Sequence, residues 1–320
     1  MLKVFFRYAI ISFTGIVLNG NALAQQDPQF SLYMLNMLYY NPAYAGIPGT
    51  TNFTAIHRSQ WLGYTSTFDG AGAPNTQVIS MNTPLSKLNS GVGLHIVNDN
   101  LGVINNLEGQ ASVAYHLAFK KSILSIGVRG GFYSQTMDFD KYRYIDPGDP
   151  LLDHGQESQM RPDLAAGLFF RAEKYYAGFS TNHIIQSEFD FGDDSLRNAL
   201  ESHMYLTGGY SYDLNYDIVL KPSFMVKTDL NTFSFELSLL ATIRDRLWGG
   251  ISYRQSDSMV GVIGYSFMRD DSFKVGYGFD YVINAQEAKQ PTSHEFLLSY
   301  TLPVLGSAEH KIIRTPRFRH

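Results

Sequence analysis

Long segments in which apolar and polar residues alternate strictly run through most of this chain. In "TFSFELSL" (residues 232–239) every second position is aromatic or aliphatic, and the positions between hold Thr, Ser and Glu. The same pattern recurs in "ILSIGVRGGF" (123–132) and "FKVGYGFDY" (273–281). Successive side chains of a β-strand point to opposite faces, so alternation over this many residues predicts strands. We therefore expect an all-β chain.

The length of these segments and the chemistry of their two faces favour a membrane protein. The segments run for about ten residues, which is the length of a tilted membrane strand, whereas soluble strands average about five or six. One face is apolar and aromatic, and the other holds Gly, Ser and charged residues, as expected when lipid lies outside a barrel and water inside. A soluble β-sandwich is the alternative. We predict a transmembrane antiparallel β-barrel.

The connections between the segments agree with such a barrel. About fourteen strands can be located, an even number as in single-chain bacterial barrels. Five joins, such as "AEK" and "TIRD", are short and polar, and two of the connections between them are long (137–160 and 183–199). This pattern matches periplasmic turns and extracellular loops, although joins such as "DLN" are short on the outer rim too. The predicted strands start near Thr50, Asn75, Ser90, Asn105, Ser122, Arg161, Lys174, Leu200, Tyr216, Asn231, Arg246, Asp257, Asp271 and Ser293.

The first residues read as a secretory signal. Lys3 and Arg7 precede an apolar run of signal-peptide length, and "ALA" ending at Ala24 provides a small-residue cleavage site. Residues 1–24 are therefore predicted to be a signal peptide that is removed on export. The mature protein is expected in the outer membrane of a Gram-negative bacterium.

The rest of the chain divides into three parts. Residues 25–49 form an N-terminal segment, residues 50–302 the outer-membrane β-barrel, and residues 303–320 a basic periplasmic tail. The tail is either disordered or a docking peptide for a periplasmic partner. Trp61, Trp248 and the tyrosines near strand ends are expected to form the aromatic girdles at the two membrane interfaces.

The stretch "YYNPAYAG" (39–46) ends the N-terminal segment. A residue before proline is kept out of the helical region, so the Asn-Pro step sets a turn, and the glycine at its end relieves crowding. By geometry the segment can cross or plug the lumen, because irregular backbone at membrane depth is tolerated where it meets protein or water. The alternative is an element that binds a partner's domain. The candidate residues for that contact are Asn41, Pro42, Ala43 and Gly46.

Composition excludes several kinds of chemistry. The chain has no Cys, which removes disulfides and thiolate sites, and its net charge of −4 gives no overall basic surface for nucleic acid. His57 and Ser59 share a strand face, but no third residue that would orient the imidazole is evident. We predict no catalytic residue, no cofactor and no metal ligand. Four lumen-side charges either define an ion path or are ordinary lumen charges, some of them paired: Arg129, Glu236, Lys274 and Asp280.

Several motifs in combination carry a family resemblance. They are "DPQFSLYMLNMLYYNPAYAG" (27–46), "HRSQWLGY" (57–64), "GAPNTQVISMNTPL" (72–85), "GVGLHIVNDNLG" (91–102) and "RPDLAAGLFFRAEKYYAGFSTNHI" (161–184), followed by "SHEFLLSY" and "TPRFR". With these motifs the chain resembles the PorP/SprF family of outer-membrane proteins, which accompany type IX secretion and gliding motility. The resemblance covers essentially the whole mature chain.

The resemblance implies an outer-membrane barrel without enzymatic activity. One branch of the family belongs to the core secretion machinery, and the other is paired with adhesins that carry a type IX C-terminal sorting domain. The expected partners are a secreted adhesin outside, peptidoglycan-binding or ring components in the periplasm, and outer-membrane lipid. A FadL-like transport barrel for a hydrophobic or small solute is the alternative. Further candidates for partner contact are Arg58, Gln60, Trp61, Asn98, Asp99, Arg314, Pro316, Arg317 and Phe318.

Overall fold

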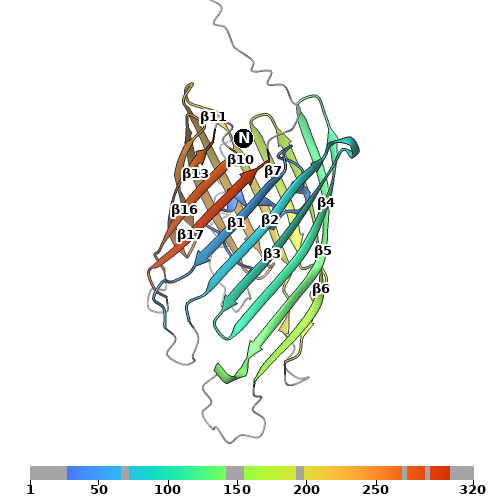
Figure 1. Cartoon of the computed structure of the whole chain (residues 1–320), viewed down its shortest axis with the longest axis vertical. Coiled ribbons are helices and arrows are strands. Elements are labelled where there is room, and N and C mark those ends of the chain that lie inside the picture. Colours follow the sequence, from blue (N-terminus) through green and yellow to red (C-terminus); the bar gives the residue numbers. More distant parts are fainter. Residues whose placement is uncertain are drawn as a thin grey trace, which may run out of the picture.

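The alternating segments form the wall of a closed antiparallel barrel, drawn in Figure 1. This computed structural model describes residues 27–65, 72–141, 155–191, 198–268, 272–284 and 289–302. The predicted signal peptide (1–24) and basic tail (303–320) lie outside the described residues, and with the tail lie Arg314, Pro316, Arg317 and Phe318.

The barrel strands follow one another in chain order around the wall. They are β1 (Asn52–Ser59), β2 (Asn75–Leu85), β3 (Ser90–Leu101), β4 (Ile104–Ala118), β5 (Ser122–Asp138), β6 (Gln156–Ala172), β7 (Tyr175–Asn182), β10 (His203–Tyr210), β12 (Ile218–Thr228), β13 (Phe233–Ile243), β14 (Leu247–Arg254), β15 (Ser258–Phe267), β16 (Phe273–Val282) and β17 (Thr292–Thr301). The first strand pairs with the last, and β10 pairs with β12. These pairings close the sheet and leave no free edge.

Short elements complete the described chain. The N-terminal segment holds η1 (Tyr33–Leu35), α2 (Met37–Tyr40) and η2 (Pro42–Tyr44), and two single turns, η3 (Ser86–Leu88) and η4 (Phe139–Lys141), follow β2 and β5. The two-residue strand β11 (Tyr212–Asp213) adds to β12, and β8 (Glu188–Phe189) pairs with β9 (Asn198–Ala199). Over the described ranges, no helix is long and apolar enough to cross a membrane.

The predicted strands are confirmed, with one start clearly displaced. The strand expected to begin near Arg161 begins at Gln156, where it pairs with Asp138 of β5. Residues 156–160 are mostly polar on both faces, so apolar alternation does not mark them, although their backbone continues the ladder. The prediction therefore found the apolar part of β6 and missed its polar extension.

The two faces of the wall carry the predicted chemistry. Leu237 of β13 is 53% exposed on the outside, whereas the next residue toward the N-terminus, Glu236, is 2% exposed and points inward. In β5 the outward Val128 is 61% exposed and the inward Arg129 is 2% exposed. An apolar outside and a polar inside are typical of a transmembrane β-barrel.

Candidate functional site in the barrel lumen

The N-terminal segment, residues 27–47, lies inside the barrel and is called the plug below. In Figure 1 it is the blue segment seen behind β1 and β2. Phe30, Leu32, Tyr33 and Ala43 have no exposed surface. The plug side chains share one apolar cluster with inward residues of ten wall strands, β1–β3, β6, β10, β12–β15 and β17. These wall residues are Ile56, Val78, Val97, Phe169, Tyr205, Met225, Leu240, Trp248, Val260, Val262 and Leu297.

The Asn-Pro step ties the plug to two wall strands. Asn41 has the extended backbone (φ −137°, ψ 114°) expected before proline, and its Oδ1 accepts a 2.9 Å hydrogen bond from the Ala43 N–H, which caps η2. Its Nδ2 donates to the carbonyl oxygens of Leu168 in β6 (2.9 Å) and Phe179 in β7 (3.2 Å). One amide side chain therefore holds the turn and anchors it to the wall.

Glycines in the wall allow this close approach. A Cβ on Gly167 would lie 2.2 Å from Asn41 Oδ1, and one on Gly127 would lie 2.4 Å from the backbone nitrogen of Ala43. Real Cβ atoms do not approach so closely, so only glycine fits at these two wall positions. The plug itself ends its turns at Gly46, which has φ +77°. The wall is shaped to receive the turn around η2.

A buried ion-pair network holds the start of the plug. Arg58 of β1 contacts Asp280 of β16 (Nη2 to Oδ2, 2.7 Å) and Glu295 of β17 (Nη1 to Oε2, 3.2 Å). The Glu295 carboxylate accepts the backbone N–H groups of Ser31 (2.7 Å) and Leu32 (2.9 Å), and the Ser31 hydroxyl contacts Asp280. The three charged residues are at most 2% exposed. Their pairing therefore also satisfies plug backbone groups that water cannot reach.

Two further arginines bind plug carbonyl groups. Arg254 of β14 pairs with Glu236 (Nε to Oε2, 2.9 Å) and donates to the carbonyl oxygen of Phe30 (3.4 Å). Arg129 of β5 donates to the carbonyl oxygen of Tyr39 (2.6 Å). Three of the four predicted lumen charges, Arg129, Glu236 and Asp280, thus hold the plug or pair with a residue that does.

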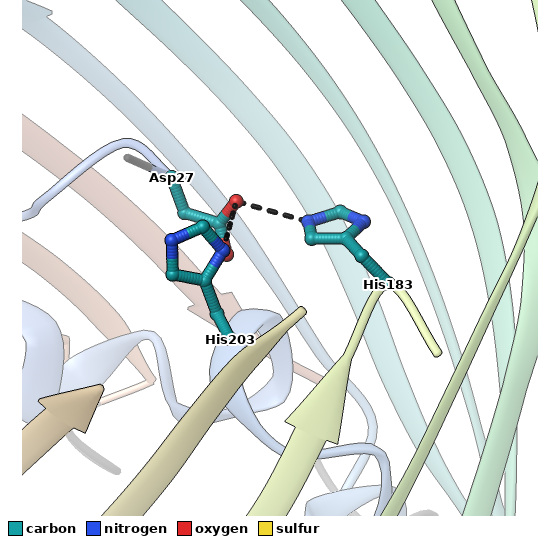
Figure 2. Close-up of side chains that lie close together, drawn as sticks. All are labelled: Asp27, His183 and His203. Atoms are coloured by element: carbon teal, nitrogen blue, oxygen red, sulfur yellow. Dashed lines mark hydrogen bonds and ion pairs between the residues drawn. The ribbon is translucent and has the colours of Figure 1, made fainter. Parts of the chain in front are cut away.

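A second polar cluster surrounds the first described residue of the plug, Asp27 (Figure 2). Its Oδ1 lies 2.9 Å from Nε2 of His183, directly after β7, and 3.5 Å from Nδ1 of His203, at the start of β10. The Tyr205 hydroxyl donates to Asp27 Oδ2 (2.6 Å), and the Lys227 ammonium donates to the Asp27 carbonyl oxygen (3.0 Å). All five residues are buried.

His183 bridges two carboxylates. Its Nδ1 lies 3.0 Å from Oδ2 of Asp163 in β6, which also accepts a 2.6 Å hydrogen bond from Gln110. Burial by itself would lower the pKa of His183, but Asp27 and Asp163 raise it to about 10. Burial would likewise raise the pKa of Asp27, and the neighbouring His203 and His183 lower it well below its usual value. His183 therefore lies between two carboxylates that both favour its protonated form.

A cavity lies at the rim of the short turns. It has a volume of about 490 Å³ and is lined on one side by the plug residues Met34, Leu35 and Tyr44 and on others by Lys274 and Trp248. The plug forms its inner boundary. Lys274, the fourth predicted lumen charge, faces this space.

The sequence matches the family described as type IX secretion system membrane protein PorP/SprF over residues 22–300. The chain belongs to this family. The match includes the residues of the plug and all of the barrel wall except Thr301, the last residue of β17.

Solved structures resemble the PorP/SprF chain in fold. A TodX deltaS2S3 mutant, described as a monoaromatic hydrocarbon channel, matches with a TM-score of 0.50 at 10% identity, covering 82% of this chain and 93% of that one. The Acinetobacter baumannii outer membrane protein Omp33 matches with a TM-score of 0.45 at 8% identity, covering 79% and 99%. At such low sequence identities, the similarity shows a shared fold and nothing more. No curated protein matches the sequence.

The predicted partner-binding residues of the PorP/SprF chain fall into two groups. Asn41, Pro42 and Ala43 are buried in the lumen, as is Arg58, and Gly46 packs against the wall. Their contacts described above are made within the chain, and a partner role for them stays a prediction.

The remaining described candidates lie toward the rim of the long loops. Gln60 and Trp61 follow β1, and Lys289 Nζ lies 5.4 Å from the centre of the Trp61 ring. Trp61 has a φ of 48°, which is unusual for a bulky residue. In β3, Asn98 points outward and donates to Gln77 (2.8 Å), whereas Asp99 points inward and accepts from the Thr76 hydroxyl (2.6 Å).

The prediction for Trp248 is wrong. It was expected in an aromatic girdle, but it is 5% exposed and its ring points into the lumen. The ring covers Gly264 and Gly276, where added Cβ atoms would lie 2.0 and 2.5 Å from it. Strand alternation explains the difference, because the outward positions of β14 belong to Leu247 and Ile251. Trp248 lies near the rim of the short turns, but its ring faces the lumen and not the lipid.

His57 and Ser59 do lie together, on the outward face. His57 Nε2 is 3.2 Å from Ser59 Oγ, and the Gln77 amide nitrogen is 3.4 Å from His57 Nδ1. An amide nitrogen therefore lies at Nδ1, where a catalytic triad places a carboxylate that holds the imidazole.

The cluster around Asp27 was not predicted from the sequence. Asp27 and His183 are 156 residues apart, and His203 belongs to another strand. No spacing motif links them, and only the closed barrel and the inserted plug bring them together. A signal in the sequence was that a histidine stands on each side of the long connection between two adjacent alternating segments, at residues 183 and 203.

Proposed function

We propose that this PorP/SprF barrel acts as a non-enzymatic platform of type IX secretion. In this proposal it supports secretion or surface attachment of an adhesin that carries a type IX C-terminal sorting domain. The main support is that residues of the chain itself fill the middle of the lumen, from Phe30 to Ile47, and are tied to the wall on several sides. A barrel occupied in this way offers its rims for binding.

In this proposal each rim of the barrel binds a different class of partner. The rim of the long loops, with Gln60 and Trp61, faces the secreted adhesin. The opposite rim carries the short turns and the end of β17 at Thr301, from which the predicted basic tail would reach periplasmic peptidoglycan-binding or ring components.

A transport function is the second candidate, and one observation favours it. The cavity of about 490 Å³ beneath the plug is large enough for a small solute and includes both apolar and polar side chains. Transport through the barrel would require the plug to move.

Purification from native envelopes tests the proposal. The tagged protein is extracted gently, and co-purifying chains are identified by mass spectrometry. A large secreted protein with a type IX sorting domain supports the adhesin platform, and periplasmic ring or peptidoglycan-binding components without cargo support a core-machinery role. Recovery of lipid or small molecules alone, together with normal cargo secretion in a deletion strain, would favour transport.

A further inference from the structure

The cluster around Asp27 has the composition of a transition-metal site. Asp27, His183 and His203 each offer one ligand atom, and these atoms lie within 4.8 Å of one another. Two imidazoles and one carboxylate are a donor set that Zn²⁺ uses in proteins, with ligand bonds of about 2.0–2.2 Å. Hard cations such as Ca²⁺ and Mg²⁺ prefer oxygen ligands only.

Among the described residues, the His203 ring lies beside the rings of His183 and Tyr205, but its nitrogens find no hydrogen-bond partner there. It is 2% exposed, and neither ring nitrogen makes a hydrogen bond, although Nδ1 lies 3.5 Å from Asp27. A buried polar group without a partner costs free energy and calls for an explanation. Figure 2 shows the His203 ring beside the Asp27 carboxylate, on the side opposite His183.

The surroundings of the cluster supply outer-shell support. Asp163 holds Nδ1 of His183 at 3.0 Å, which leaves Nε2 directed at Asp27, and Gln110 in turn holds Asp163. A carboxylate behind a ligating histidine orients the ring and makes it a stronger ligand. The Tyr205 hydroxyl holds the second oxygen of Asp27, so that Oδ1 remains available.

The charges in the pocket also favour a cation. Asp27 and Asp163 contribute two carboxylates, and the Lys227 ammonium contacts the backbone carbonyl oxygen of Asp27. A metal ion between the three residues would be coordinated by Nε2 of His183, the ring nitrogen that faces Asp27 Oδ1.

We propose that Asp27, His183 and His203 bind a divalent transition-metal ion of the Zn²⁺ class. The ion would join the start of the plug to the ends of β7 and β10. It would therefore act as a clamp that fixes the plug in the lumen, and it would leave one coordination position for water.

Metal titration of the full-length mature protein, without a polyhistidine tag and after chelator treatment, tests this site. We expect one Zn²⁺ per chain by calorimetry and mass spectrometry, and tetrahedral Co²⁺ absorption when Co²⁺ alone is added. His203→Gln should lose the ion, and the substitution removes no hydrogen bond that the His203 ring makes among the described residues. Asp163→Asn should weaken binding by about 10–100-fold. His57→Gln, which changes an outward histidine, is the matched control and should bind as the wild type does.

Hydrogen exchange gives an independent readout. Zn²⁺ should slow exchange of the backbone amides of residues 29–33 in the wild type and in His57→Gln, but not in His203→Gln. Absence of stoichiometric binding by the wild type would overturn the proposal. Equal binding by a correctly assembled His203→Gln variant, judged by its circular dichroism and heat-dependent gel mobility, would overturn it as well.

Discussion

At the scale of single residues, the plug can pack against the wall because some wall positions are glycines, which have no side chain. Gly167→Ala should destabilise the barrel by about 1–3 kcal/mol, the usual cost of overpacking, because the new Cβ would collide with Asn41 Oδ1. Gly261→Ala is the matched control, since no atom lies within 4 Å of its added Cβ. Urea unfolding in lipid vesicles measures both variants. Equal free energies of unfolding for Gly167→Ala and Gly261→Ala would mean that the turn at η2 does not pack closely against β6.

Buried charge makes a second prediction at this scale. Arg58→Met would leave Asp280 and Glu295 without their shared partner, and breaking a buried pair costs about 3–5 kcal/mol. Arg244→Met is the control, because the Arg244 side chain is 77% exposed and its pair with Asp217 lies in solvent. The same unfolding assay should show a large loss for the first variant and no measurable change for the second. A stable Arg58→Met barrel would show that the network contributes little to holding the plug.

At the scale of the strand, the outward face should behave as a lipid-facing surface. Ile251 lies in the middle of β14, is 62% exposed and pairs with Leu239 and Gly261. Ile251→Arg should cost about 2–4 kcal/mol, whereas Asn98→Arg, near the end of β3, should cost about 0–1 kcal/mol. Unfolding in vesicles compares the two. Similar costs for both would contradict the assignment of membrane depth.

Strands were predictable because their signal is local. Alternation within ten or so residues marks both the strand and its lipid face, as Leu237 and Glu236 illustrate. The signal fails where both faces have the same polarity, as at the start of β6, and it cannot assign an aromatic residue such as Trp248 without the register.

Contacts made by the plug were not predictable in detail. "YYNPAYAG" indicated a turn, and chain geometry allowed it to enter the lumen. The partners of Asn41, however, are 127 and 138 residues away, at Leu168 and Phe179. Such pairings depend on which strands close the barrel and how far each is shifted. The ion pairs of Arg58 and the grouping of Asp27 with His183 depend on the same closure.

At the scale of the whole molecule, the plug determines whether the barrel is a channel. A lumen occupied by residues 27–47 should carry no steady ionic current. Wild-type protein in a planar bilayer is therefore expected to show no steady conductance. A variant that lacks residues 27–47 should conduct, because its inward wall is polar and charged. Arg58→Met combined with Arg254→Met, which keeps the plug and removes two of its anchors, should show intermittent openings.

Assembly controls make this comparison decisive. Each variant is first checked for β-sheet content by circular dichroism and for heat-dependent gel mobility, so that a misfolded barrel is not read as a closed one. Steady conductance by the wild type would mean that a continuous path passes the plug, and it would favour transport. A closed wild type and an open deletion variant would show that the plug seals the lumen. In a sealed barrel, secretion partners can act only through the rims.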